Sequence, residues 1–262
     1  MTQSPSGRRL RLLSSPTLAK ALILIAFVLL WQLVSQVSPR DILPGPLVVF
    51  SALISLLTLK TIPDLPEALG LTLLEISAGF LIATILGLST ALLFSTTRLL
   101  WGAYLPIIIV IFAVPHIIIL PVFIVFFGLG ALSKIAYAVL AAYPVIVLGG
   151  YGAISRVDRS TILAARSLGV RSRDLLTKIV LPASVSSLVG TLRVAFAVVI
   201  ATTIVAEMIG SIGGLGFYLT TAYEEFNTPE YLAMALIVMA FALVLNSTAS
   251  FLESRMRRWR RG

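Results

Sequence analysis

Long stretches of apolar residues, separated by short polar segments, dominate the pattern along the chain. Six of them are close to the ~20 residues that a helix needs to cross a bilayer. These stretches are residues 21–38, 68–94, 101–127, 134–151, 184–209 and 231–252. The pattern predicts an all-α polytopic membrane protein with about six transmembrane helices. No small-x-small cleavage site follows the first stretch, so we expect a transmembrane helix there rather than a cleaved signal peptide.

The distribution of charge predicts the orientation of these helices. Lys and Arg accumulate in the cytoplasmic loops of membrane proteins. If residues 1–20 are cytoplasmic, then of the 20 Lys and Arg residues only Arg40, Lys60 and Lys134 fall outside. Both termini are therefore expected in the cytoplasm. The predicted organisation is a basic cytoplasmic N-terminus (1–20), a single transmembrane domain (21–252) and a basic cytoplasmic tail (253–262).

The composition excludes several classes of function. Hydrophobic residues make up 58% of the chain and charged residues 12%, whereas a soluble domain has about 25% charged residues. The absence of Cys excludes disulfides, thiolate metal sites and Cys nucleophiles, and a single His, His116, excludes paired-His metal motifs. The sequence contains no P-loop pattern, so any ATP that transport consumes must bind to another chain. We therefore expect no enzymatic activity, no metal and no cofactor.

Two segments depart from a plain helical bundle. Pro46 begins an apolar stretch with helical spacing over residues 47–59, which is too short to span and is expected on the outer membrane surface. The third predicted span contains Pro106, Pro115 and Pro121. Each proline removes a backbone hydrogen bond, which is tolerated at membrane depth only where neighbours or a wet cavity satisfy the freed carbonyl. This span is therefore a candidate lining of a translocation path.

The cytoplasmic loop at residues 152–182 is far longer than a turn between two helices needs. Ser160 is a candidate N-cap of a short helix that Gly169 would end. A second short helix is expected to begin at Ser172, with Pro182 after it. The loop combines basic and apolar side chains, which is typical of a docking surface for a soluble partner. The alternative is an amphipathic hairpin that lies on lipid headgroups.

This loop also carries a family motif. Ala164-Ala165, three residues, Gly169, nine residues and Ile179-Val-Leu181-Pro182 resemble the EAA motif of ABC-importer membrane subunits, with Leu163 where the family usually has Glu. Three further segments resemble motifs of the nitrate/sulfonate/taurine branch of that family. They are Leu43-Pro44-Gly45-Pro46, Phe127-Gly128-Leu129-Gly130 with Ser133-Lys134, and Ala206-Glu207-Met208-Ile209-Gly210 with Gly214-Leu215-Gly216.

The resemblance implies a type I ABC-importer permease fold in the cell inner membrane. Two permease copies would form the translocation path, two cytoplasmic ATPases would hydrolyse ATP, and an external binding protein would deliver the solute. The residues that it assigns to coupling with the ATPase are Ala164, Ala165, Arg166, Gly169, Ile179, Leu181 and Pro182. A small anion such as a sulfonate, taurine or nitrate is the expected solute. The alternative is a thiamine-type pyrimidine or another heterocyclic vitamin precursor.

Polar residues within the spans are candidates for the translocation path. They are Pro115, His116, Arg193 and Glu207. Each also has a structural interpretation: His116 could satisfy a carbonyl freed by Pro115, Arg193 could extend to the interface, and Glu207 could lie near it. We favour a structural role for Glu75. A secondary transporter or channel, the alternative from another class, would usually need more intramembrane acids than Glu75 and Glu207.

The basic residues at 255–261 directly follow the last predicted span. A basic segment in this position is expected to bind anionic membrane lipid, at about 1 kcal/mol per basic residue, rather than nucleic acid.

Overall fold

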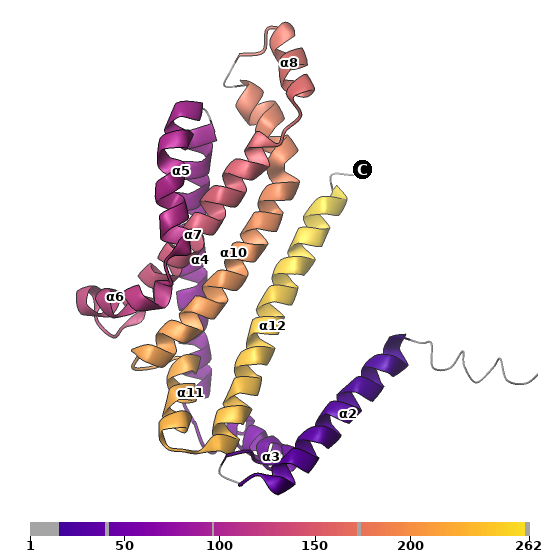
Figure 1. The fold of residues 1–262 in the computed structure, drawn as a ribbon, viewed down its shortest axis with the longest axis vertical. Helices are drawn as coiled ribbons and strands as arrows, with labels where there is room; N and C mark the ends of the chain where they lie inside the picture. Colours follow the sequence, from indigo (N-terminus) through magenta and orange to yellow (C-terminus); the bar gives the residue numbers. More distant parts are fainter. Residues whose placement is uncertain (1–15, 40–41, 96, 172–173, 260–262) are drawn as a thin grey trace, which may run out of the picture. The chain divides into compact units, whose positions relative to one another are not determined.

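A computed structural model describes residues 16–39, 42–95, 97–171 and 174–259, and this part of the chain is helical throughout, without strands (Figure 1). The elements are α2 (Pro16–Val37), α3 (Pro46–Leu57), α4 (Leu65–Ser95), α5 (Arg98–Ala113), η1 (His116–Ile119), α6 (Leu120–Phe127), α7 (Ala131–Ser155), α8 (Arg159–Ser167), η2 (Leu175–Val180), α10 (Leu181–Ile209), α11 (Leu215–Glu224) and α12 (Thr228–Trp259). Among the described residues, 5 helices are long and apolar enough to cross a membrane, or 6 if the bent pair formed by α5 and η1–α6 counts as one span. The predicted all-α membrane fold is confirmed.

The chain divides into two compact units. The first unit comprises residues 1–62 and 221–237, and includes α2 and α3. The Trp31 indole donates a hydrogen bond to the Pro44 carbonyl (3.1 Å), which fixes the turn between these helices. α3 begins at Pro46, where the missing N–H costs nothing because the first helical N–H groups have no partner in the helix.

The second unit comprises residues 63–220 and 238–262, and its core lies between α4, α7 and α10 (Figure 1). Small residues recur at every fourth position of α4 and are buried: Gly79, Ala83, Gly87 and Ala91. They fit against α7 in one constant register, in which Gly79 meets Ala138 and Gly87 meets Ile146. A Cβ on Gly87 would lie only 2.7 Å from the Ile146 Cβ. Small residues thus let the two helices approach closely, as in other membrane helix pairs.

The helix α10 packs against α4 and α7 and runs antiparallel to both. Val199 of α10 lies against Gly79, and Thr191 lies against Gly149 of α7. Ala195 and Val199 are fully buried among apolar side chains of α4 and α7. α4 and α7 run parallel, and α10 runs antiparallel to both. A residue one turn before Gly79 in α4 therefore lies at the same level as residues one turn before Ala138 in α7 and one turn after Val199 in α10.

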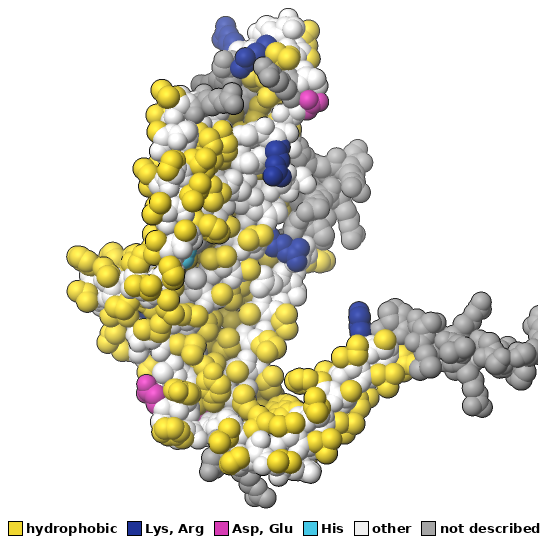
Figure 2. Space-filling model, viewed as in Figure 1, with side chains coloured by type: hydrophobic (Ala, Val, Ile, Leu, Met, Phe, Trp, Pro, Cys, Tyr) yellow, Lys and Arg dark blue, Asp and Glu magenta, His cyan; other side chains and the backbone are white. Residues whose placement is uncertain are grey.

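The predicted break in the third span is present, but at one of its three prolines. α5 continues through Pro106 and ends at Ala113. Pro115 then adopts an extended conformation (φ −61°, ψ 101°), and the helices on either side of this break differ in direction by 84°. Pro121 lies in the first turn of α6, where a proline needs no hydrogen-bond partner. Hydrophobic side chains cover the visible surfaces of α5 and α6 (Figure 2).

Candidate functional site

The helix α8 protrudes from the ends of α7 and α10 and corresponds to the first half of the predicted cytoplasmic loop (Figure 1). Its N-cap is Asp158, so the prediction of Ser160 as the cap is wrong. Asp158 accepts hydrogen bonds from the Ser160 backbone N–H (3.0 Å) and hydroxyl (2.7 Å). Asp158 lies one position before the first residue of α8, and its side chain reaches the Ser160 N–H, which has no partner within the helix. The hydroxyl and then the amide of Ser160 lower the pKa of Asp158.

Gly169 ends this helix, as predicted. Its φ is +76°, in the left-handed region that glycine adopts without strain. Gly169 N–H donates to the Arg166 carbonyl (3.0 Å) and Val170 N–H donates to the Ala165 carbonyl (3.2 Å). This pair of bonds is a Schellman motif, and Val170 and Ala165 make the apolar contact that accompanies it. The end of α8 therefore has a defined geometry.

The two alanines of the motif point in opposite directions. Ala165 is buried with Ile154, Leu175 and Val180, where it attaches α8 to the ends of α7 and α10. Ala164 is exposed. Two large apolar side chains of the segment are also exposed, Leu163 by 52% and Leu168 by 84%. Arg166 and Gly169 are exposed as well.

The second half of the loop is not a separate short helix. Ser172, its predicted start, lies outside the described residues. Leu175–Val180 forms a wide π-turn that continues directly into α10, and Pro182 lies in the first turn of α10 rather than after a helix. Because Pro182 has no N–H, it removes one backbone hydrogen bond where the π-turn passes into α10. Ile179 and Leu181 are half-buried at this junction.

Glu207 lies at the far end of α10 and is 1% exposed. Its Oε1 accepts a hydrogen bond from the Thr72 hydroxyl of α4 (2.6 Å), and its Oε2 accepts one from the Gly216 N–H at the start of α11 (2.8 Å). Thr72 in turn accepts a bond from the Leu215 N–H (3.0 Å). A Cβ on Gly216 would lie 2.6 Å from the Glu207 Cβ. The carboxylate thus joins α4, α10 and the glycine-rich segment before α11.

Lys134 is fully buried in the first turn of α7, although the sequence placed it among the external charges. Its ammonium group donates to the carbonyls of Leu129 and Gly130, the latter at 3.1 Å. These carbonyls precede α7 and point back along it, so a side chain four residues into the helix can reach them. Lys134 also interacts electrostatically with Glu75 and Glu207.

Two further buried polar side chains lie close to this group. Glu75 of α4 is fully buried, and neither of its oxygens has a hydrogen-bond partner among the described residues. Thr203 of α10 is also fully buried, and its hydroxyl is unpartnered in the same part of the chain. Sequence reasoning did not select Thr72, Lys134 or Thr203 as candidate site residues. These residues lie on three different helices, one or two turns from the contact between Gly79, Ala138 and Val199, and only the packing of the helices brings them together.

The other predicted path residues are Pro115, His116 and Arg193. Pro115 and His116 form the break between α5 and η1, and the buried Nε2 of His116 has no partner among the described residues. Arg193 is exposed in the middle of α10. A hydroxyl chain that the sequence did not suggest joins three helices: Tyr143 of α7 bonds Tyr104 of α5 (2.7 Å) and Thr90 of α4 (3.0 Å).

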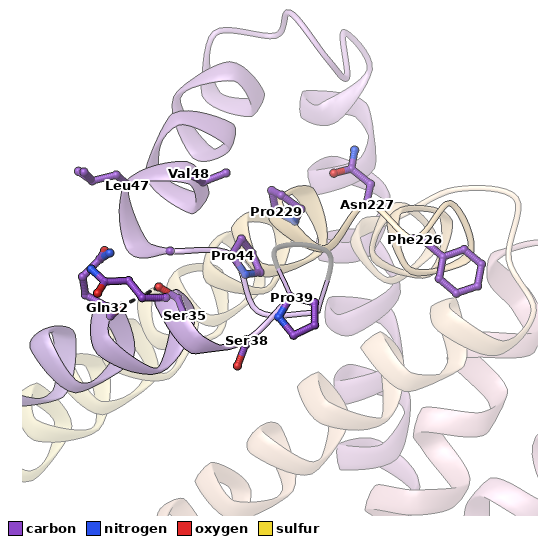
Figure 3. A pocket seen from close by; sticks show the side chains of 12 residues that line it. Gln32, Ser35, Ser38, Pro39, Pro44, Leu47, Val48, Phe226, Asn227 and Pro229 are labelled. Carbon is purple, nitrogen blue, oxygen red and sulfur yellow. Dashed lines mark hydrogen bonds between the residues drawn. The ribbon is translucent and has the colours of Figure 1, made fainter.

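The first unit contains a pocket of about 970 Å³. Residues from the end of α2, the start of α3, the segment before α12 and the first turn of α12 line it (Figure 3), including Gln32, Ser35, Leu47, Asn227 and Pro229. All of the lining side chains are uncharged. In the described part of the chain, no three residues among His, Asp and Glu form a group suited to a metal ion.

Comparison with known proteins agrees with this architecture. Residues 79–258 match the family described as "Binding-protein-dependent transport system inner membrane component". A probable ABC transporter permease protein from Haemophilus influenzae is 30% identical over 91% of this chain and 96% of its own length. The taurine transport permease TauC of Escherichia coli is 28% identical over 94% of this chain and 89% of its own length. The formylaminopyrimidine transport permease ThiX of Halalkalibacterium halodurans is 23% identical over 95% of this chain and 98% of its own length.

The fold is also that of a solved ABC transporter. The chain superposes on a chain of the MetNI methionine ABC transporter, in an inward-facing conformation, with a TM-score of 0.65 over 76% of this chain and 97% of that chain, at 21% identity. The family match covers more than half of the sequence, including the core helices α7 and α10 and the protruding α8. The chain belongs to the family of inner membrane components of binding-protein-dependent transport systems, and is an ABC importer permease subunit.

Proposed function

We propose that this permease transmits ATP-driven motion through α8 to the helices that form a path for a small solute. The exposed surface of α8 carries the proposal. Its buried side fixes it to α7 and α10 through Ala165, and its free side presents Leu163, Ala164 and Leu168 to a partner. Exposed large apolar side chains beside basic groups, outside the spans, mark a protein-binding surface. In this proposal both termini and α8 are cytoplasmic, and a soluble ATPase binds this surface.

A change at Leu168 tests the coupling surface without disturbing the attachment of α8. Leu168→Asp replaces an 84% exposed apolar side chain, so the helix should form normally while the docking contact acquires a charge without a partner. We expect the partner ATPase to be lost from the purified complex and solute uptake to be abolished. Leu168→Met, the matched control, keeps an apolar side chain and should retain both. Normal ATPase recovery with Leu168→Asp would overturn the assignment of this surface.

Ala165 would be a poorer test of the same contact. It is buried against Ile154, Leu175 and Val180, so Ala165→Asp would place a charge in an apolar cluster and detach α8 from the bundle. In our proposal, movement of α8 is transmitted into α10 through four residues at their junction: Ala165, Ile179, Leu181 and Pro182. Arg166 would contact the partner directly, and Gly169 would fix the end of the coupling helix.

The proposed assembly contains two copies of the permease, two ATPase subunits and an external binding protein. Family membership supports the binding protein and the ATPase, because binding-protein dependence defines the family. In this proposal ATP is hydrolysed only on the partner subunits, and the permease has no ATPase site and needs no cofactor. Measuring the mass of the purified complex by light scattering, with and without cross-linking, tests the stoichiometry.

We propose a small anion of the sulfonate, taurine or nitrate type as the solute, since TauC matches almost the whole chain. A formylaminopyrimidine-type precursor is the second candidate, because the match to ThiX has similar coverage. Selectivity in either case would reside mainly in the binding protein. Calorimetric titration of the purified binding protein with taurine, an alkanesulfonate, nitrate and a formylaminopyrimidine distinguishes these solutes. Tight binding of the pyrimidine alone would replace the first proposal.

His116 and Pro115 are the residues that we propose for the path itself. The break in the helix leaves a half-buried imidazole whose Nε2 has no partner among the described residues, and a passing solute could supply that partner. Arg193 is a second candidate because it is an exposed cation in a span. For Glu207 we propose a role at the end of the path, since its carboxylate joins α4 to the segment before α11. Uptake by His116→Ala and His116→Gln, at equal amounts of permease in the membrane, tests the first of these roles.

A further inference from the structure

The positions of Glu75, Lys134 and Thr203 follow from the register of the helix packing. Gly79 is a point where α4, α7 and α10 meet: a Cβ there would lie 3.2 Å from the Ala138 Cβ and 3.8 Å from the Val199 Cγ1. Glu75 lies one turn before Gly79, Lys134 one turn before Ala138, and Thr203 one turn after Val199. Because α10 is antiparallel to α4 and α7, all three steps lead in the same direction. The three side chains therefore project into one level of the bundle, which we call the polar layer.

The polar layer is closed to solvent on both sides. Glu75, Lys134 and Thr203 are all fully buried. On one side, the layer ends at the close contact between Gly79, Ala138 and Val199. On the other side, the Thr72–Glu207 hydrogen bond and the start of α11 cover it.

The buried groups of the polar layer do not satisfy one another. Lys134 directs its ammonium group to the carbonyls before α7, and Glu207 directs its carboxylate to Thr72 and Gly216. No donor reaches either oxygen of Glu75, and the hydroxyl of Thr203 has no partner, among the described residues. Glu75 and Glu207 can form a hydrogen bond with each other only when one of the two carboxyls carries a proton. Buried polar groups without partners are rare in native structures, and an unseen water or ion is a usual reason for them.

The charges in and beside the polar layer do not balance. Two carboxylates, Glu75 and Glu207, interact electrostatically with one ammonium group, Lys134. Among the described residues, the other helices packed against α4 bring no second cation to this level. α6 has no ionisable side chain. Arg193 of α10 is exposed and lies ten residues, about three turns, from Thr203, and Arg98 begins α5 just after the opposite end of α4. An uncompensated charge in a sealed, low-dielectric site is strongly unfavourable. With both carboxyls ionised, the layer thus lacks one positive charge, and Glu75 is the carboxyl that no donor reaches among the described residues.

We propose that the polar layer binds one monovalent cation at Glu75, with the Thr203 hydroxyl as its second oxygen partner. A proton or a sodium ion supplies the same chemistry, a single positive charge beside a buried carboxylate. Carboxylate and hydroxyl oxygens are ligands that hard cations prefer. Bound there, the cation neutralises the junction of α4, α7 and α10, so its loss loosens the packing that the small residues of α4 establish.

The thermal stability of the full-length permease in lipid nanodiscs tests this proposal. One series varies pH in sodium-free choline buffer, and a second replaces sodium with choline at constant pH and ionic strength. A ligand that binds only the folded state raises stability with the logarithm of its concentration. At cation activities far below the dissociation constant of the site, the thermal midpoint should not change with cation activity. At activities far above it, we expect the midpoint to fall by about 3–6 °C for each tenfold fall in cation activity.

The two series separate the two sources of charge. A proton at Glu75 makes the midpoint fall as pH rises, and sodium makes it fall as choline replaces sodium. Glu75→Gln removes one negative charge at constant shape and should abolish the dependence that the wild type shows. Glu224→Gln, the matched control, removes an exposed carboxylate and should leave the dependence intact.

Either dependence, if lost in Glu75→Gln, supports the proposal. A wild-type midpoint that responds to neither series overturns it without any variant, and so does a dependence that Glu75→Gln retains. Should Glu75→Gln fail to fold, Thr203→Val provides the second test. It removes one oxygen partner, so the dependence should move to higher cation activity by about tenfold or more; an unchanged dependence overturns the proposal. None of these outcomes depends on the solute or on α8.

Discussion

Replacing Thr72 by Val removes one hydroxyl while leaving the shape of the side chain almost unchanged. That hydroxyl donates to Glu207 Oε1 (2.6 Å) and accepts from the Leu215 N–H (3.0 Å), and Thr72 is fully buried. The variant therefore leaves two buried polar groups without partners. A hydrogen bond between membrane helices contributes about 1–2 kcal/mol in peptides and less on average in proteins, and an unsatisfied buried group costs about 1–3 kcal/mol. We expect Thr72→Val to cost about 2–3 kcal/mol.

Thr72→Ser is the matched control because it keeps the hydroxyl and loses a single methyl group. Burial of one such group contributes about 0.8 kcal/mol, so Ser should cost about 1 kcal/mol. Heating the purified permease in detergent, followed by size-exclusion chromatography, gives the midpoint at which the monodisperse peak is lost. At about 2–4 °C per kcal/mol for a chain of this size, Val should lower the midpoint by about 4–12 °C and Ser by about 2–4 °C.

The order of the two variants decides the question. If apolar burial alone determined stability at this position, Val would be the better substitute and Ser the worse one. A Thr72→Val protein that is as stable as Thr72→Ser would show that the bonds to Glu207 and Leu215 contribute little, and the proposed link between α4 and the start of α11 would be refuted.

Three further predictions concern the close contacts and the cap of α8. Gly79→Ala adds a Cβ at 3.2 Å from that of Ala138 and should lower the stability of the fold by about 1 kcal/mol, because overpacking outweighs the better helix propensity of Ala. Ala138→Gly should lower the stability less in the Gly79→Ala protein than in the wild type. Thermal midpoints of the four proteins in this double-mutant cycle test the prediction. Gly216→Ala places its Cβ 2.6–2.9 Å from atoms of α10 and should detach the start of α11, which increased proteolysis there would report. Hydrogen bonds from Ser160 lower the pKa of Asp158, so its capping is present above the pKa of the unfolded chain and lost as pH falls through the lower folded pKa. The amide protection factors of α8, which correct for the intrinsic exchange rate, should therefore fall on acidification in the wild type but not in Asp158→Asn; equal decreases would contradict this.

Local chemistry made several features predictable from the sequence. Runs of apolar residues long enough to span a bilayer predict helices because a backbone in lipid must satisfy its own hydrogen bonds. The prolines of the third span predicted a break, which occurs at Pro115, and Gly169 predicted the end of α8, since both depend on the backbone freedom of single residues. The EAA-like spacing around Ala164 predicted the family, which the match over residues 79–258 confirms.

Errors arose where two positions compete for the same local role. Both Asp158 and Ser160 are good N-cap residues, and the better reach of the Asp side chain decides the start of α8. Pro182 was interpreted as a residue that follows a helix, but proline is equally acceptable in a first turn, and the apolar cluster beneath α8 makes η2 continuous with α10. The second choice cannot be made from the sequence alone, because packing of the apolar cluster selects between two locally acceptable conformations.

The sequence by itself determined the membrane class of this protein, its helical composition, a break in the third span and the family to which it belongs. All of these depend on hydrophobicity, backbone conformation or spacing within one segment. Only the tertiary structure showed that Ala165 faces the bundle while Leu168 faces outward, and that Lys134 is buried. It also brought Glu75, Lys134 and Thr203 to one level. Those relations depend on the rotation and register of neighbouring helices, which side-chain packing sets at Gly79 and Gly87 and which no single helix encodes.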